Sequence, residues 1–333
     1  MRRTLLALAA LLAAGAALAQ NPPQRPPPQS PPQSAAEEPP VAEIEVSGER
    51  PGPSLWKVSR GDHVVWLLGT LDPLPRRMTW RSLEVERVIA QAQEVLPSVP
   101  SVNARIGPIL AIRLYMQWRH TEKIPDGQTL RDWLTPQLYA RLLQLESRYD
   151  RHDRKLESMR PIFAAWRLYD RAIDASGLTS HNDIQDTVLA LARKHRVRVD
   201  KMPLRVEDPR AILAAVNEIP RAAEIDCLAA TGDRLETDVG AMQQRARAWA
   251  LGDVNALRAL PYARQRQTCW DAVTRAPALK ALADRAAAEW DSALQRALTN
   301  NRSTLALKPI YDLIAPDGVL AQLRSRGYTV EGP

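Results

Sequence analysis

The stretch His63-Val64-Val65-Trp66-Leu67-Leu68-Gly69-Thr70, with the segments that follow it, decides the fold class of this chain. This run is continuously apolar up to a glycine, which is typical of a buried central strand. Apolar residues then recur at helical spacing from Trp80 to Ala92, in a helix that we expect Thr79 to cap, and Glu94-Val95-Leu96 reads as another strand. The stretch therefore predicts a strand-loop-helix-strand unit with its loop at Leu71 to Met78.

The C-terminal end of the chain repeats this pattern. Ser303 to Leu307 predicts a strand, Pro309 to Asp317 a loop, Gly318 to Ser325 a short helix, and Tyr328 to Val330 a last strand. The sequence therefore predicts an α/β fold with a mixed central sheet, built from two strand-loop-helix-strand units at the chain ends.

The long middle region is predicted to be helical. Thr135-Pro136 and Asp208-Pro209 each combine a capping residue with a proline suited to the first helical position, and a helix is expected from Asp183 to His195. Arg210 to Ala297 is rich in Ala, Leu and Arg and predicts further helices. Breaks are expected at Gly232, Gly252 and Pro261.

Residues 1–19 have the order of a secretory signal peptide. Arg2 and Arg3 precede an apolar run from Leu5 to Leu12, and Ala17-Leu18-Ala19 matches a cleavage site. The alternative is a retained anchor, but the run is shorter than the roughly 20 residues of a spanning helix. We therefore expect a periplasmic or secreted protein with no transmembrane segment after signal cleavage.

The residues after the signal divide into a tether and a domain. Residues 20–40 hold nine prolines among Gln and Ser, a composition that favours a disordered, extended linker. Residues 41–333 are long enough for one large core, and we expect a single domain there.

The charge of the chain points away from nucleic acids. The net charge of +7 falls to +5 without Arg2 and Arg3, and the basic residues are mixed with acids along the chain. A scattered excess of this size is typical of a solvated surface, and no nucleic-acid-binding motif accompanies it. We expect no nucleic-acid partner.

The two cysteines are predicted to form a disulfide. Cys227 and Cys269 are the only cysteines of a chain predicted to enter an oxidising compartment. Closing a loop of this length stabilises the folded state by about 4 kcal/mol in the chain-entropy model. No histidine is near either cysteine in sequence, which disfavours a catalytic thiol.

Motifs at both ends of the chain resemble the TraB/GumN family, and the resemblance extends from about residue 54 to the end. The matching segments are Leu55-Trp56-Lys57-Val58, Trp66 to Pro75, Arg160-Pro161, Asp183 to Val199, Gly318 to Leu323, and Gly327-Tyr328-Thr329-Val330. The resemblance implies a mixed α/β fold related to the Tiki, EreA and ChaN proteins. It also implies a hydrolytic site made of two Gly-x-x-His motifs, a Glu and an Arg, whose histidines and carboxylate could hold a divalent metal that activates water.

This sequence departs from the family pattern at the site. The first motif reads Gly69-Thr70-Leu71-Asp72, followed by Pro73, and the second reads Pro309-Ile310-Tyr311-Asp312, so each ends in Asp instead of His. The family's Glu falls near Pro97-Ser98, where no acid stands, and only Arg285 retains the expected Arg. The chain thus resembles a divergent member of the family that lacks the motif histidines.

Three functions remain open. The leading hypothesis is a catalytically degenerate relative of metal-dependent hydrolases, which binds an unknown protein or polymer of the cell envelope and has no cofactor. The first alternative is an active peptidase- or esterase-type hydrolase, in which Asp72, Asp312 and Arg285 form a rebuilt site for a divalent metal. Against this alternative, Asp is frequent in turns, so both aspartates can be explained as turn residues without a chemical role. The second alternative is an envelope scaffold that acts through its proline-rich tether.

Overall fold

The computed structural model describes residues 52–76, 78–104, 106–149, 155–181, 183–260 and 265–333. The predictions for the signal, for the tether and for a break at Pro261 lie outside these residues. The described residues belong to one compact unit, Arg50–Pro333.

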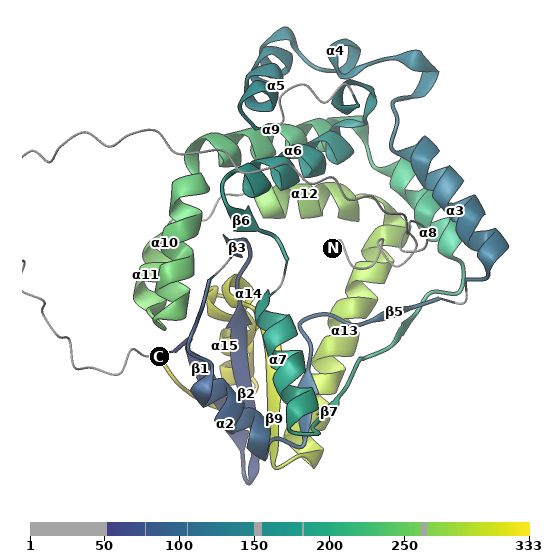
Figure 1. The fold of residues 1–333 in the computed structure, drawn as a ribbon. Coiled ribbons are helices and arrows are strands. Elements are labelled where there is room, and N and C mark those ends of the chain that lie inside the picture. The colour runs from purple at the N-terminus through teal and green to yellow at the C-terminus, as the bar shows by residue number, and fades with distance from the viewer. Residues whose placement is uncertain (1–51, 77, 105, 150–154, 182, 261–264) are drawn as a thin grey trace, which may run out of the picture. The chain divides into compact units, whose positions relative to one another are not determined.

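A six-stranded sheet occupies one end of this unit (Figure 1). Its strands, in spatial order, are β10 (Thr329–Glu331), β1 (Leu55–Arg60), β2 (His63–Thr70), β9 (Ser303–Pro309), β4 (Glu94–Leu96) and β7 (Arg198–Val199). β1 is antiparallel to both of its neighbours, and the pairs β2–β9, β9–β4 and β4–β7 are parallel. The carboxyl ends of all strands except β1 therefore lie at the same edge of the sheet.

Helices account for most of the remaining described chain. Those before residue 200 are α2 (Leu83–Gln91), α3 (Pro108–Thr121), α4 (Leu130–Trp133), α5 (Pro136–Tyr149), α6 (Pro161–Ala175) and α7 (Asp183–Lys194). Those after it are α8 (Pro209–Ala215), α9 (Arg221–Thr237), α10 (Val239–Ala250), α11 (Val254–Ala259), α12 (Gln265–Thr274), α13 (Pro277–Asn300), α14 (Ile310–Ile314) and α15 (Val319–Ser325). Single 3₁₀ turns lie at Pro125–Gly127, Leu156–Ser158 and Val216–Glu218. Among the described residues, no helix is both long enough and apolar enough to cross a membrane.

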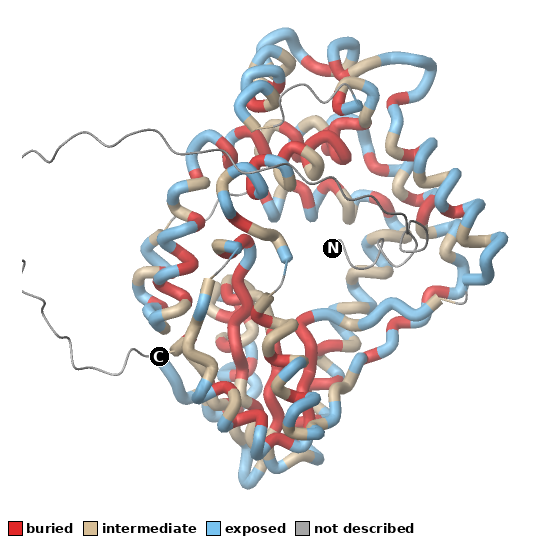
Figure 2. The backbone as a smooth tube through the Cα atoms, viewed as in Figure 1, coloured by how far each residue is buried: buried red, intermediate tan, exposed pale blue. Residues whose placement is uncertain are grey.

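The apolar runs of the sequence form the core around the sheet. Val65, Leu67 and Leu68 of β2 are fully buried, as are Leu305 and Leu307 of β9. Helices α2 and α7 cover one face of the sheet, and α13, α14 and α15 cover the other, which explains why these strands are apolar on both faces (Figures 1 and 2). This confirms the predicted α/β class and the mixed central sheet.

The helical middle region has a core of its own. Residues of α4, α5, α6, α9 and α12 form a second cluster of buried apolar side chains. A disulfide joins Cys227 of α9 to Cys269 of α12, with 4.6 Å between their Cα atoms, which confirms the predicted pairing.

Two short ribbons extend from the carboxyl edge of the sheet. β3 (Leu74–Pro75) pairs antiparallel with β6 (Leu178–Thr179), and β5 (Val102–Asn103) pairs parallel with β8 (Leu204–Arg205). β3–β6 joins the segment that follows β2 to the segment that follows α6, and β5–β8 joins the segments that follow β4 and β7.

Three local predictions were wrong, the first two for a packing reason. Thr79 does not cap a helix: α2 begins at Leu83, because the preceding Trp80 packs edge to face on Trp249 at a centroid distance of 5.3 Å. Gly232 does not break a helix but lies inside α9, where a Cβ atom would stand 3.3 Å from the Arg141 guanidinium. The segment Pro309 to Asp317 is not entirely a loop, since it contains α14.

Candidate functional site

The two sequence-predicted aspartates leave the sheet from neighbouring strands. Thr70, the last residue of β2, pairs with Pro309, the last residue of β9. Asp72 follows Thr70 by two residues, and Asp312 follows Pro309 by three. The fold therefore places both motif segments side by side at the carboxyl edge, where α/β folds bind their ligands.

The motif loop after β2 is held in place by burial. The indole nitrogen of Trp249 donates a hydrogen bond of 2.8 Å to the Gly69 carbonyl, and Thr70 and Pro73 are buried. Asp72 is exposed between the buried Leu71 and Pro73. The Trp249 hydrogen bond and the buried residues thus hold the loop backbone in place, while the Asp72 carboxylate is exposed to solvent.

Gly69 is explained by the helix that follows β9. A Cβ atom at this position would lie 2.3 Å from Cδ1 and 3.0 Å from Cβ of Ile310. The missing side chain lets α14 pack directly on the end of β2. The glycine of the motif therefore has a structural role that does not depend on chemistry.

The Asp312 carboxylate lies in α14 beside positive charges. Nη2 of Arg266 is 3.7 Å from Oδ2 of Asp312, and both side chains are more than two-fifths exposed. Lys308, the penultimate residue of β9, is close enough for the Asp312 charge to raise its pKa. Asp312 thus pairs with Arg266 and interacts electrostatically with Lys308.

The structure does not bring Arg285 to these aspartates. Its guanidinium donates a hydrogen bond of 2.9 Å to the carbonyl of Arg205 in β8. Within the described part of the chain, no contact joins Arg285 to Asp72 or to Asp312. Asp312 pairs with Arg266 instead.

The position of the family's Glu is occupied by a neutral network. Ser98, just after β4, donates its hydroxyl to Oε1 of Gln185 in α7 at 2.8 Å, and its backbone N–H reaches the same oxygen at 3.2 Å. Trp290 of α13 donates to the Pro97 carbonyl at 3.2 Å. These bonds anchor the end of β4 without supplying an acid.

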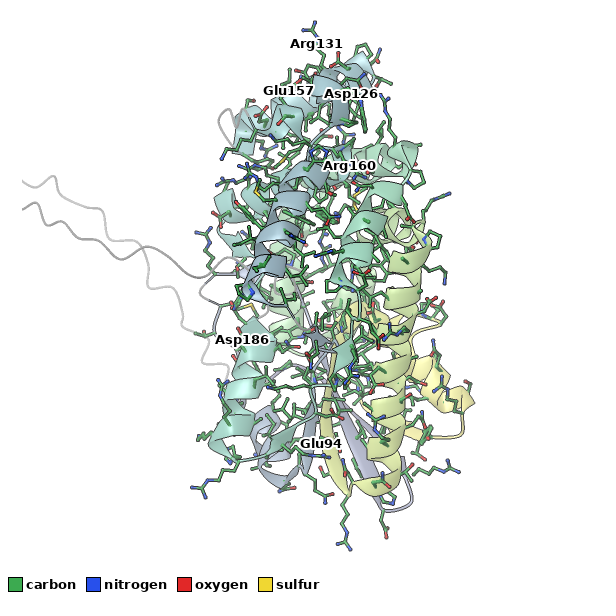
Figure 3. The ribbon with its side chains drawn as sticks, turned by 90° about the vertical axis from the view of Figure 1, so that its right-hand side faces the viewer. Glu94, Asp126, Arg131, Glu157, Arg160 and Asp186 are labelled. Atoms are coloured by element: carbon green, nitrogen blue, oxygen red, sulfur yellow. A yellow bond between two sulfur atoms is a disulfide. The ribbon has the colours of Figure 1, made fainter. Side chains whose placement is uncertain are left out.

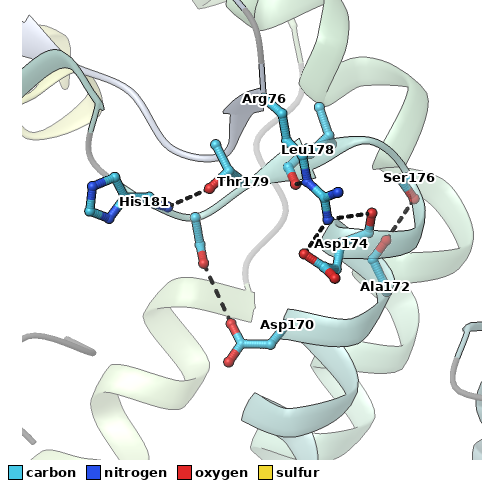
Figure 4. Close-up of polar contacts among 9 residues, drawn as sticks. Arg76, Asp170, Ala172, Asp174, Ser176, Leu178, Thr179 and His181 are labelled. Atoms are coloured by element: carbon cyan, nitrogen blue, oxygen red, sulfur yellow. Dashed lines mark hydrogen bonds and ion pairs between the residues drawn. The ribbon is translucent and has the colours of Figure 1, made fainter. Parts of the chain in front are cut away.

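Polar contacts also secure the segment beyond β3 (Figure 4). The Arg76 guanidinium binds the Leu178 carbonyl at 3.3 Å and both the carbonyl and the carboxylate of Asp174 at the end of α6. His181 follows β6, and its Nε2 lies 2.7 Å from a carboxylate oxygen of Asp186. This histidine is thus paired within its own segment.

The donor set at this edge is sparse within the described chain. Among the residues that the structure describes, no three His, Cys, Asp or Glu side chains gather closely enough to hold one. Arg266 and Lys308 lie beside the Asp312 carboxylate, and their positive charges oppose a second cation there. The buried acid of the sheet, Glu94, starts β4 and pairs with Arg198 at 2.7 Å, at the edge away from the motif loops (Figure 3).

Lys308 is the residue that the sequence analysis missed. Its ammonium nitrogen lies 4.1 Å from the centroid of the Trp290 ring, and burial lowers its pKa, with Arg266 adding to the effect and Asp312 and Asp291 opposing it. Within the described residues no hydrogen bond reaches this ammonium group. The sequence did contain a signal for this residue: Lys308 directly follows the apolar run Leu305 to Leu307 and precedes Pro309.

A hollow adjoins Lys308 between α13 and α15. Its volume is about 260 Å³, and Trp290, Leu294 and Leu323 contribute apolar walls. Arg326 and Asp291 form an ion pair of 2.9 Å at the same hollow. The arrangement offers a cation beside apolar walls to a small ligand.

Comparison with known proteins identifies one relationship. The model of the TraB/PrgY/gumN family matches residues 54–332. No curated protein and no solved structure matches the chain.

Proposed function

The chain belongs to the TraB/PrgY/gumN family, and from this premise we propose that it is a catalytically degenerate member that acts in the cell envelope by binding a small acidic ligand. The ligand occupies the hollow beside Lys308. Export to an oxidising compartment is part of the proposal, and the Cys227–Cys269 disulfide supports it, because disulfides persist in such compartments.

The observation that carries this proposal is the half-buried Lys308 ammonium. Lys308 has given up part of its hydration, and an aromatic ring faces it where hydrogen-bond acceptors would be expected. A carboxylate or phosphate in the hollow would supply the missing acceptors through a charge-assisted hydrogen bond. The apolar walls suit a short hydrocarbon body attached to that group.

Thermal unfolding in the presence of glutarate or inorganic phosphate tests this proposal. Ligand that binds only the folded state stabilises it by about 2.7 kcal/mol at one hundred times the dissociation constant. We expect saturable stabilisation of the wild type by at least one probe, and its loss in Lys308→Met, which keeps the chain length and removes the charge.

The matched control is Lys280→Met, on the same helix as Trp290 but exposed and paired with Asp284. This variant should keep the response to the probe. If Lys308→Met responds as strongly as the wild type, the acidic-ligand hypothesis fails.

The rival function is an active hydrolase with a rebuilt metal site. The adjacency of the Asp72 and Asp312 segments, through the Thr70–Pro309 pair, favours it. Elemental mass spectrometry of the purified protein tests it directly: near-stoichiometric metal in the wild type, lost in an Asp72→Asn, Asp312→Asn double variant but kept in Asp317→Asn, would support the hydrolase. Equal metal content in all three proteins would argue against it.

A further inference from the structure

Exposed apolar side chains are concentrated on one part of the molecule. Of the eleven large apolar residues that are exposed in the described chain, seven lie between Val99 and Met116. They are Val99, Val102, Ile106, Ile109, Ile112, Tyr115 and Met116. Single exposed apolar residues are ordinary, but several on one helix face can mark an interaction surface, and four of these seven residues lie in α3.

Helix α3 forms the centre of this surface. Ile109, Ile112 and Met116 are spaced by three and four residues and therefore share one face of the helix, with exposed fractions of 70%, 66% and 62%. The opposite face carries the buried Leu114 and Thr121, and α3 packs on α8 (Figures 1 and 2). The inner face of α3 thus packs on α8, whereas no described residue covers the outer apolar face.

Basic residues flank this outer face. At about 100° per residue, Arg113 and Arg119 lie roughly 60° to either side of Met116, and both are exposed. No ion pair joins Arg113, Arg119 or the following Lys123 to any described residue. The one acid of this segment, Glu122, accepts a hydrogen bond from the Trp118 indole.

We propose that α3 docks this protein on the surface of an anionic phospholipid bilayer. An apolar stripe between basic residues is the arrangement by which amphipathic helices lie in the headgroup region, with the side chains of the stripe among the acyl chains and the cations at the phosphates. The charge pattern favours an anionic bilayer over a second copy of this protein as the partner of α3. A second copy of the same face would place arginines opposite arginines with no acid between them.

The proposal is independent of the acidic-ligand function, because α3 shares no residue with the Lys308 hollow. Its test is sedimentation of the full chain with vesicles of phosphatidylcholine alone, or of three parts phosphatidylcholine to one part phosphatidylglycerol. We expect binding to the anionic vesicles, weaker binding to the neutral ones, and a loss of most of the difference at roughly 0.5 M salt.

Two pairs of variants assign the binding to α3. Ile112→Ser with Met116→Ser should weaken vesicle binding at least tenfold, whereas Leu83→Ser with Leu251→Ser, which removes apolar residues exposed elsewhere, should not. Arg113→Gln with Arg119→Gln should weaken binding to anionic vesicles about fivefold for each charge removed. Arg302→Gln with Arg324→Gln is the matched charge control.

Three results would overturn the proposal. The first is the absence of binding to either vesicle. The second is binding that all variants share, which would place the membrane contact in another part of the chain. The third is a dimer in analytical ultracentrifugation that dissociates in the Ile112→Ser, Met116→Ser variant while vesicles leave the wild type unbound, which would assign the face to a second copy.

Discussion

Gly69 shows how one residue of a family motif serves the fold. The backbone of β2 approaches Ile310 so closely that no side chain fits between them. Gly318 has a similar place, since a Cβ atom there would lie 2.6 Å from the Asp312 carbonyl oxygen. Both glycines belong to the segments that carry the family resemblance, so part of this signature is explained by packing alone.

Replacing Gly69 by alanine should therefore destabilise the protein. The added Cβ forces Ile310 and the start of α14 to move, and overpacking of this kind costs about 1–3 kcal/mol. Urea denaturation measures the change. Gly107→Ala is the control, because nothing lies within 4 Å of a Cβ at that position, and an equal effect of both substitutions would contradict the packing argument.

Lys308 gives a prediction for pH dependence. Burial lowers its pKa below the ordinary value of 10.5, so between the lowered pKa and 10.5 the folded state binds fewer protons than the unfolded chain. The contribution of Lys308 to the free energy of unfolding therefore rises with pH across this window. Urea denaturation at a series of pH values up to 10.5 should show that the free energy of unfolding of the wild type rises with pH. The Lys308→Met variant should lack this rise.

Neighbouring charges should move this window in opposite directions. Asp312→Asn removes a charge that raises the pKa of Lys308. The pH range over which the free energy of unfolding rises should therefore extend to lower pH. Arg266→Gln removes a charge that lowers the pKa, so the window should narrow. If neither variant changes how the free energy of unfolding depends on pH, a group other than Lys308 causes that dependence.

At the scale of single residues, sequence reasoning found the positions but not their environments. The spacing from the strand ends located Asp72 and Asp312, which the fold places on neighbouring strands. Their neighbours could not be predicted, because Arg266 approaches Asp312 from α12 and Lys308 gains its burial from α13. Contacts between distant segments leave no local periodicity in a sequence.

At the scale of helices, Arg160 connects several elements of the helical region. It precedes α6, is buried, and binds Glu224 of α9, the Val216 carbonyl at 2.9 Å and the Asn217 side chain at 2.9 Å. Burial is the largest influence on the pKa of Glu224 and raises it, although Arg160 opposes the shift. The Arg160-Pro161 segment that resembles the family thus joins helices, with Pro161 as the first residue of α6.

Arg160→Met should destabilise the protein by about 3–5 kcal/mol, because it leaves Glu224 buried without its partner. The substitution raises the pKa of Glu224 further, so the folded state binds more protons than the unfolded chain above pH 4.5. The stability of the variant should then fall as pH rises through this window. Urea denaturation of both proteins at acid and neutral pH checks this, and a loss of stability that is the same at each pH would contradict it.

The disulfide gives a second prediction at this scale. Cys227 and Cys269 are 42 residues apart, and opening a loop of this length should lower the free energy of unfolding by about 4 kcal/mol. Urea denaturation of a Cys227→Ala, Cys269→Ala double variant measures it. The wild type in reducing agent should show a similar loss, and a loss below about 1 kcal/mol in both would refute the chain-entropy account.

Helix boundaries were predictable where a cap is encoded locally. Thr135 accepts a hydrogen bond from the Leu138 N–H, and Asp208 accepts from the N–H groups of Arg210 and Ala211, as their Thr-Pro and Asp-Pro pairs indicate. Gly232 does not end its helix, because its missing side chain makes room for Arg141, and such a glycine looks the same in sequence as one that ends a helix. Local rules fail where a tertiary contact decides.

At the scale of the whole molecule, the sequence predicted the two end units but not how they combine. β9 lies between β2 and β4, so the C-terminal unit is inserted into the N-terminal one. β10 then pairs with β1 at the far edge of the sheet. Each strand could be recognised alone, but this order could not, because it depends on pairings between opposite ends of the chain.

The insertion of β9 has a consequence for how the chain is made. A ribosome releases β2 and β4 long before residues 303–309, so these two strands lack their common neighbour throughout most of synthesis. The nascent chain cannot close its sheet early, and its central strands stay available to chaperones until translation is almost complete.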